Sequence, residues 1–127
     1  MLRPLAPTTI HPPFARYAHG IEVPPGARLV FCSGQLGIDA VATIPPSAFE
    51  QAILCFRAIE AILGEAGMTL DHLVRLNAYV TGREHLPAYM AARDSLLSGP
   101  PPASTLMIVS GFARPEFLVE VEAVAAQ

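Results

Sequence analysis

Two glutamates near the end of the chain have a spacing that could support acid–base chemistry. Glu120 and Glu122 lie two residues apart in an alternating segment, so a strand would place both on one face, roughly 6.5–7 Å apart. Their neighbours are apolar, and burial would raise the pKa of either carboxyl group. Glu120 is the stronger candidate for an acid or base. An ion pair with Arg75, or with an arginine of a neighbouring subunit, would instead make this carboxylate structural.

Other polar residues form smaller candidate clusters. Ser33 precedes Gly34 after an apolar run, where a hydroxyl could bind a ligand oxygen or simply cap a turn. Tyr17 lies beside Arg16 and His19, and all three side chains can form hydrogen bonds; a half-buried aromatic with a surface arginine is the alternative. No His, Cys or acidic residues have metal-site spacing and no glycine-rich nucleotide loop is present, so we expect no metal and no cofactor.

Composition excludes several classes of function. All eight basic residues are arginine, which excludes a Schiff-base lysine and a P-loop lysine. The formal charge of −3 comes without a basic block, so nucleic acid is a poor partner. No signal peptide or membrane helix is evident, and we expect a cytoplasmic protein. Cys32 and Cys55 lie in apolar runs, and we expect buried free thiols.

Hydrophobic periodicity predicts an α+β fold. The 127 residues fit one domain, 1–127, in which the proline-rich residues 1–13 form an extended arm. Alternating or apolar runs predict strands over residues 17–23, 29–32, 73–81, 106–109 and 117–125. Three- and four-residue apolar steps predict a helix from Ser47 to Gly64 or Gly67, with Ser47 and Glu50 at capping-box spacing. A second helix is predicted over residues 84–97, where Thr81 and Glu84 could form its cap.

The predicted sheet needs cover on both faces. Residues 106–109 are apolar at every position, and two helices can cover only one face of the sheet. Apolar residues make up 52% of the chain and charged residues 15%, which is apolar for so small a domain. We therefore expect the second face to contact other subunits.

Several motifs occur together in a fixed order. They are a first strand containing tyrosine, the run Phe31-Cys32-Ser33-Gly34-Gln35, a helix ending Glu65-Ala66-Gly67-Met68, the pair Pro102-Ala103, and Val119-Glu120-Val121-Glu122-Ala123. From Tyr17 onward this sequence resembles the RidA/YjgF family of enamine and imine deaminases. The resemblance implies a homotrimer of the chorismate-mutase-like α+β type, with sites in the clefts between subunits.

The resemblance also implies a mechanism and a set of site residues. Typical members hydrate and deaminate reactive enamines or imines, such as 2-aminoacrylate, without a cofactor. An arginine after the Pro-Ala pair holds the substrate carboxylate, and the first glutamate of the last strand orients or activates water. Matched position by position, Glu120 is the catalytic residue, and Tyr17 and Ser33 line the pocket.

The chain departs from the family pattern at the substrate-binding positions. Ser104 stands where the arginine is usual and is followed by Thr105 and Leu106; Met90 stands where asparagine is frequent. Loss of a buried bidentate arginine–carboxylate contact costs about 2–5 kcal/mol, so ordinary imino acids are expected to bind poorly. A more apolar pocket would suit a larger or uncharged ligand. Arg16 could supply a replacement cation, although a solvent-facing Arg16 is the simpler expectation.

Two functions follow from these residues. The first is a RidA-like hydrolytic deaminase of enamines or imines with altered substrate preference, in which Glu120 positions water. The alternative is a trimer of the same fold that binds a small molecule or a protein without catalysis. Ribonuclease activity, also attributed to the family, is disfavoured by the acidic charge. The expected partners are the chain itself and a small molecule, not nucleic acid or a membrane.

Overall fold

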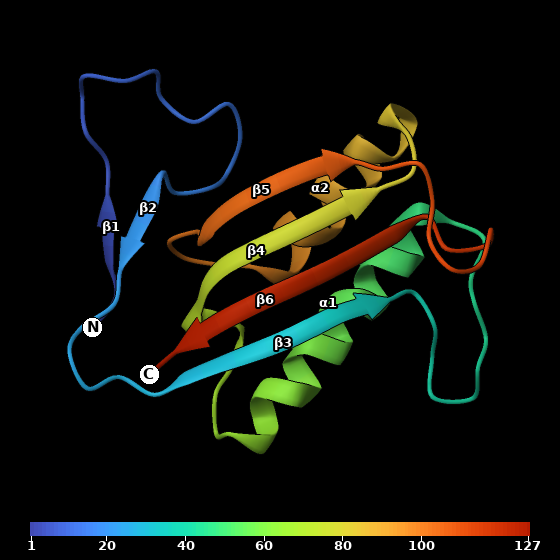
Figure 1. The fold of residues 1–127 in the computed structure, drawn as a ribbon, viewed down its shortest axis with the longest axis horizontal. Coiled ribbons are helices and arrows are strands. Elements are labelled where there is room, and N and C mark those ends of the chain that lie inside the picture. Colours follow the sequence, from blue (N-terminus) through green and yellow to red (C-terminus); the bar gives the residue numbers. More distant parts are fainter.

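A computed structural model describes residues 1–127. Its elements are β1 (Arg3–Leu5), β2 (Gly20–Glu22), β3 (Leu29–Leu36), α1 (Ala48–Glu65), the 3-10 helix η1 (Leu70–His72), β4 (Leu73–Val80), the 3-10 helix η2 (Arg83–His85), α2 (Leu86–Leu96), β5 (Ala103–Ile108) and β6 (Val119–Ala126). Strands β3 to β6 form one sheet, and β1 pairs with β2 in a small ribbon beside it (Figure 1).

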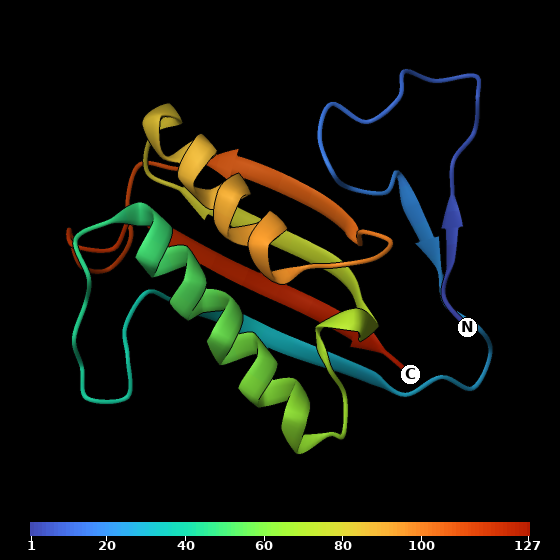
Figure 2. The same cartoon turned by 180° about the vertical axis from the view of Figure 1, so that it is seen from behind.

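The main sheet has β6 in its interior. Its strand order is β3-β6-β4-β5; β6 is antiparallel to both neighbours, whereas β4 and β5 are parallel. Both α-helices lie on one face of this sheet, as seen from behind in Figure 2. The predicted α+β class, with two helices on one face, is confirmed. The other face carries no helix, and we call it the open face.

The core lies between the sheet and the helices. Burial alternates along β4 and β6, as expected when successive side chains point to opposite faces. Buried side chains come from Val74, Leu76, Ala78 and Val80 of β4 and from Val119, Val121 and Ala123 of β6. From α1 and α2 they meet Ala52, Cys55, Phe56, Ile59, Leu63, Tyr89 and Ala92.

The ends of helix α1 follow the local sequence. The Ser47 side chain accepts a hydrogen bond from the backbone N–H of Glu50 at 3.1 Å, which forms the serine half of the predicted capping box. The helix ends at Glu65, and Gly67 has a φ of 72°, a conformation that glycine adopts without strain. The second helix is different: η2 and α2 have no side-chain cap, so the predicted Thr81–Glu84 cap does not form.

Three predicted strands have clearly different bounds in the structure. The strand expected over 106–109 begins earlier, at Ala103, and ends at Ile108. The strand expected over 17–23 is only Gly20–Glu22, so Tyr17 lies before it. The strand expected to end at Cys32 continues to Leu36, so Ser33-Gly34-Gln35 is not a turn. A register shift between Cys32 and Gln35 accommodates the extra residue, as a β-bulge does, and the strand keeps pairing with β6.

The open face of the sheet exposes apolar side chains in the single chain. Phe31 is 73% exposed, and Met107, which lies in the apolar run 106–109 that was expected to need cover, is 53% exposed. Leu106, in contrast, packs against the core. The chain therefore leaves apolar surface on the face where subunit contacts were expected. None of its helices has the length and apolar character needed to cross a membrane.

Candidate functional site

The two candidate carboxylates lie on the open face of the interior strand. In β6, Glu120 pairs with Leu36 of β3 on one side and with Tyr79 of β4 on the other, while Glu122 pairs with Asn77. Their neighbours along β6 are buried against the helices, so the two carboxylates share the opposite face, as predicted. Strand pairing on both sides fixes the backbone from which they project.

Neutral donors hold the second carboxylate. One oxygen of Glu122, Oε1, accepts a hydrogen bond from the Tyr79 hydroxyl at 2.6 Å and another from Asn77 Nδ2 at 3.1 Å. The pKa of Tyr79 is raised, first because its phenol donates to Glu122 and then because of partial burial. Glu122 therefore has a defined position without an arginine partner.

The first carboxylate has no partner in the chain. Glu120 takes part in none of the ion pairs or side-chain hydrogen bonds of the structure. The ion pair with Arg75 is absent, because that guanidinium donates to Thr105 Oγ1 at 2.7 Å. Burial, followed by the charge of Glu122, raises the pKa of Glu120. A carboxyl group of this kind can accept a proton from water.

Gly34 makes room for the Glu120 side chain. A Cβ atom built on Gly34 would lie 2.6 Å from Glu120 Oε1, which is closer than real Cβ contacts. The glycine of the predicted Ser-Gly-Gln turn therefore serves a different purpose from chain reversal: it lets the carboxylate lie across β3. Its neighbour Ser33 is exposed on the same strand.

A hollow lies next to these residues. It has a volume of about 350 Å³ and is lined by Phe31, Cys32, Ser33, Asn77, Glu122, Ala123 and Val124. Ser33, a predicted pocket residue, thus shares a cavity with Glu122, and Glu120 is the next open-face residue along β6. This arrangement joins a hydroxyl, an amide, an aromatic ring and a carboxylate within reach of one small ligand.

A second group of predicted residues lies at the opposite edge of the sheet. In β5, Ser104 pairs with Leu76, whose side chain is in the core, so Ser104 is on the helix-covered side. Leu106 shares that side, and Met90 of α2 also packs against the core. Thr105 instead lies on the open face, where it accepts the hydrogen bond from Arg75.

The segment before β2 runs along this same edge. The Ala18 N–H donates to Pro102 O at 2.9 Å, next to the start of β5. The Tyr17 hydroxyl accepts a hydrogen bond from the backbone of Phe14 at 3.2 Å. Since β3 and β5 are separated by two strands, Ser104 is about 14 Å from Ser33 across the sheet, and Tyr17, in the segment outside β5, is farther away.

Arg16 is neither the replacement cation nor the solvent-facing residue that the sequence suggested. Its guanidinium donates to Leu97 O at 2.5 Å and to Gly99 O at 2.7 Å, after the end of α2. These carbonyls have no partner within the helix, and a cation at a helix C-terminus is favourable. Arg16 therefore fastens the N-terminal segment to α2.

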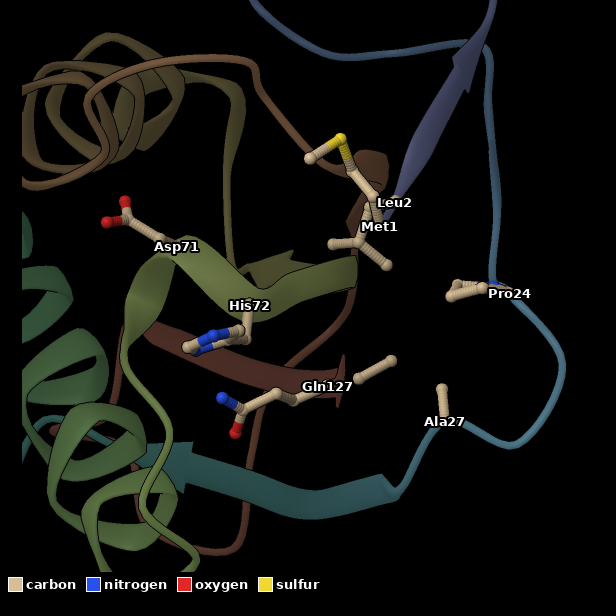
Figure 3. Close-up of a pocket in the computed structure, with 8 residues that line it drawn as sticks. Met1, Leu2, Pro24, Ala27, Asp71, His72 and Gln127 are labelled. Atoms are coloured by element: carbon tan, nitrogen blue, oxygen red, sulfur yellow. The ribbon is translucent and has the colours of Figure 1, made fainter.

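A larger hollow lies elsewhere. It has a volume of about 460 Å³ and is lined by Met1, Leu2, Pro24, Ala27, Asp71, His72, Ala126 and Gln127, none of which the sequence had suggested (Figure 3). Ala126 lies six residues beyond Glu120 in β6, which is roughly 20 Å along a strand. Volume alone therefore does not locate the candidate site.

Side chains that could supply other chemistry are few. Cys32 and Cys55 are free and buried, as predicted, and burial raises the pKa of Cys55 to about 12, which keeps the thiol protonated. No three His, Cys, Asp or Glu side chains come together in a way that could hold a metal ion. The open-face carboxylates are the polar groups best placed for chemistry.

Comparisons with known proteins agree with this geometry. A family model described as Endoribonuclease L-PSP matches residues 8–127. The crystal structure of YyfB from Yersinia pestis, a Rid-family protein of unknown function, is 28% identical with a TM-score of 0.88, covering 99% of this chain and 98% of that one. The chain belongs to the RidA/YjgF family.

Other RidA/YjgF proteins are similar over most of their length. The RutC family protein YjgH of Escherichia coli is 29% identical over 117 residues, which cover 91% of this chain and 88% of the relative. The crystal structure of RidA from the Antarctic bacterium Psychrobacter is 26% identical with a TM-score of 0.74, covering 98% of this chain and 93% of that one. The fold expected from the sequence is therefore shown.

The sequence did not identify two residues of the candidate site. Asn77 and Tyr79 lie on the open face of β4, and only the strand order shows that this face adjoins Glu122. Alternation along β4 places both side chains on one face with Arg75. Only knowledge that β4 pairs antiparallel with β6 would have placed these two side chains beside the carboxylates.

Proposed function

We propose that this RidA/YjgF protein is a cofactor-independent hydrolytic deaminase of enamines or imines, with a substrate preference altered at Ser104. The observation that carries the proposal is the unpaired Glu120 carboxyl group on the open face, with a raised pKa and a glycine beneath it. A structural carboxylate would have a cation or a hydrogen-bond donor. Glu120 has neither within the chain, so a water molecule and a substrate are suitable partners.

The proposed reaction needs only water and one proton carrier. An enamine first takes a proton on carbon and becomes an iminium ion, in which carbon is doubly bonded to a positively charged nitrogen. Glu120 then accepts a proton from water while the oxygen bonds to the iminium carbon, giving a carbinolamine. Return of that proton to nitrogen and transfer of the hydroxyl proton to the Glu120 carboxylate let the C–N bond break, and the ammonia that leaves takes up this second proton. The products are a carbonyl compound and an ammonium ion, so atoms and charge balance.

We also propose that the site is completed in a homotrimer. Glu120 and Ser33 lie toward the β3 side of the sheet, whereas Tyr17, Met90, Ser104 and Leu106 lie around β5. One chain therefore cannot bring these two groups together, but the β5 edge of one copy could lie against the open face of the next. The exposed Phe31 and Met107 side chains support such a contact.

The test is ammonia release from 2-aminoacrylate, generated enzymatically, and from enamines with larger substituents. We expect acceleration of at least one larger substrate and a decrease of about 100-fold or more in Glu120→Gln. Glu65→Gln, at the end of α1 and outside every ion pair of the chain, is the matched control and should retain full activity. Undiminished activity in Glu120→Gln would remove the proposed role.

A trimer that binds a small molecule without catalysis is the second candidate. Ser104 favours it, because the carboxylate-binding arginine of the family is missing. The unpaired state of Glu120 favours the enzyme. Partial burial of a carboxylate without a partner costs free energy, and a binder would have no use for it. A ligand that raises the melting temperature but is never converted would select the binder.

Nucleic acid and membranes are not among the proposed partners. Although the matching family model is described as an endoribonuclease, the strands of the main sheet carry two glutamates and one arginine, and the whole chain has a formal charge of −3. Such a surface repels phosphate. We propose a cytoplasmic setting, in which the partners are other copies of the chain and a small molecule.

A further inference from the structure

The open face of the sheet carries more acidic than basic side chains. Among the residues of β3 to β6, the side chains with a formal charge are Glu120, Glu122 and Arg75. Arg75 is engaged with Thr105, so its guanidinium does not neutralise either carboxylate through a direct contact. A ligand that enters this face meets an excess of negative charge.

The family arginine is missing, and the two arginines nearest the candidate residues, Arg75 and Arg16, are hydrogen-bonded within the chain. Ser104 occupies the position of the family arginine, and its strand register puts it on the helix-covered side. Arg16, the nearest substitute in the sequence, has both terminal nitrogens bound to backbone carbonyls. A substrate carboxylate would therefore lack a bidentate partner and would also be repelled by the two glutamates.

The hollow beside Glu122 suits a cation instead. Tyr79 and Asn77 both donate to Oε1, and the second oxygen of the carboxylate has no hydrogen-bond partner in the chain. The Ser33 side chain and the Phe31 ring line the same 350 Å³ space. A carboxylate oxygen, a hydroxyl and an aromatic face are groups that together bind an N–H cation.

Spacing allows this cation to be the reacting nitrogen. Alternate residues on a strand are roughly 6.5–7 Å apart, which leaves room for a C=N bond and one water molecule between the two carboxylates. Glu122 would hold the nitrogen, and Glu120 would hold the water that attacks carbon. The two glutamates then have separate tasks on one strand.

We infer that the substrates are imines or enamines without a carboxylate, bound as iminium cations with the nitrogen on Glu122. The inference rests on the proposed deaminase function and names its substrate class. Imines derived from simple amines belong to this class, whereas imines derived from amino acids do not. The missing arginine thus accompanies a change in the net charge of the bound iminium, from zero to positive.

A binding experiment tests the inference without catalysis. The probes are 2-phenylethylammonium and 3-phenylpropanoate, which share one hydrocarbon skeleton and differ in the charge of the head group. Thermal shift and calorimetry should detect the cation, with the anion bound about tenfold more weakly or not at all. Glu122→Gln should weaken cation binding about tenfold or more, and Glu65→Gln should leave it unchanged.

Phe31→Leu supplies a second variant should Glu122→Gln fail to fold. It keeps an apolar side chain at a position that is exposed in the single chain, but removes the aromatic face. Cation binding should weaken about twofold to fivefold, since an exposed cation–π contact is worth about 0.5–1 kcal/mol. Equal binding of the two probes, or cation binding that survives both substitutions, overturns the inference.

A turnover experiment separates this inference from the proposed function. A flavin amine oxidase converts 2-phenylethylamine into its imine with molecular oxygen, and a flavin amino-acid oxidase converts phenylalanine into the corresponding imino acid. The two products differ only in the carboxylate. We expect kcat/KM for hydrolysis to favour the first by about tenfold or more, and Ser104→Arg to narrow that ratio.

The possible outcomes are distinguishable. Hydrolysis that favours the imino acid would overturn the inference and leave the deaminase function intact. Selective binding of the cation, lost in Glu122→Gln, with no hydrolysis of either compound would support the cation site and remove the deaminase function. Faster hydrolysis of the carboxylate-free imine, decreased in Glu122→Gln, would support both.

Discussion

The two faces of strand β6 differ in how completely one chain satisfies them. On the helix side, Val119 and Val121 are fully buried and Ala123 nearly so, in contact with the core that α1 and α2 cover. On the open side, Glu122 has two hydrogen-bond donors, whereas Glu120 has none. One face of the strand is thus fully packed within the chain, whereas the other face has a carboxylate without a partner.

The helix side of β6 therefore serves folding, whereas the open side carries the groups proposed for function. Burial of the helix side stabilises the chain itself. The open side contributes exposed apolar surface and a desolvated carboxyl group, neither of which stabilises an isolated chain. Substitutions on the two faces should therefore have different consequences.

The largest expected effect is on the helix side. Leu76 is completely buried in β4, and Leu76→Ala should lower the free energy of unfolding by about 2–5 kcal/mol because it leaves a cavity. The melting temperature should fall by roughly 7–15 °C. Leu29→Ala is the control, since Leu29 is 51% exposed in β3, and it should change stability by less than about 1 kcal/mol. Equal losses in both variants would contradict the contrast between the faces.

On the open face, a substitution should weaken the association of subunits rather than the fold of the single chain. Phe31→Asp places a charge where a subunit contact is proposed, and should weaken association by about 2 kcal/mol, or roughly thirtyfold, while the single chain stays folded. Sedimentation velocity measures the change. Val41→Asp, at an exposed loop residue, should leave the trimer intact. A wild-type protein found only as single chains at micromolar concentration would remove the assembled site altogether.

The helix side was also the more predictable of the two faces. Alternation along β4 and β6 and the apolar steps of α1 depend on local periodicity, and the structure confirms both. The failures occurred where local signals compete with pairing. Ser33-Gly34-Gln35 has the composition of a turn, but the pairing of β3 with β6 holds it in the strand through a bulge.

The open face required information that sequence spacing does not contain. The shared face of Glu120 and Glu122 follows from their separation, but the contacts of Asn77 and Tyr79 with Glu122 depend on strand order. The position of Ser104 depends on its register with Leu76. Arg16 contacts carbonyls more than 80 residues later in the chain, and no local pattern indicates such a partner.

A smaller effect is expected when Glu120 is kept but its side chain is displaced. In Gly34→Ala the new Cβ atom would crowd Glu120 Oε1, and the flexible side chain would move because it is not fixed by any partner. Activity should decrease by about tenfold with little change in melting temperature. Gly111→Ala is the control, since no atom lies within 4 Å of the added Cβ atom. Full kcat/KM in Gly34→Ala would show that Glu120 need not occupy this place.

The smallest expected effect concerns stability and pH. Because the pKa of Glu120 is raised in the folded chain, that chain binds more protons than the unfolded one between the ordinary value, about 4.3, and the raised value. The free energy of unfolding should therefore decrease as pH rises through this window, and the ionised carboxylate is destabilising at neutral pH. Glu120→Gln should raise the melting temperature by about 1–2 °C at neutral pH and lose this advantage near pH 4.

Calorimetry of the wild type, Glu120→Gln and the control Glu65→Gln across this pH range measures the difference. Stability and activity should then change in opposite directions at a single residue, because the desolvation that makes Glu120 a suitable base also raises the free energy of its charged form. A Glu120→Gln variant less stable than the wild type at neutral pH would instead mean that the carboxylate has a stabilising partner in the assembled protein. An arginine from a neighbouring copy would then be the group to seek.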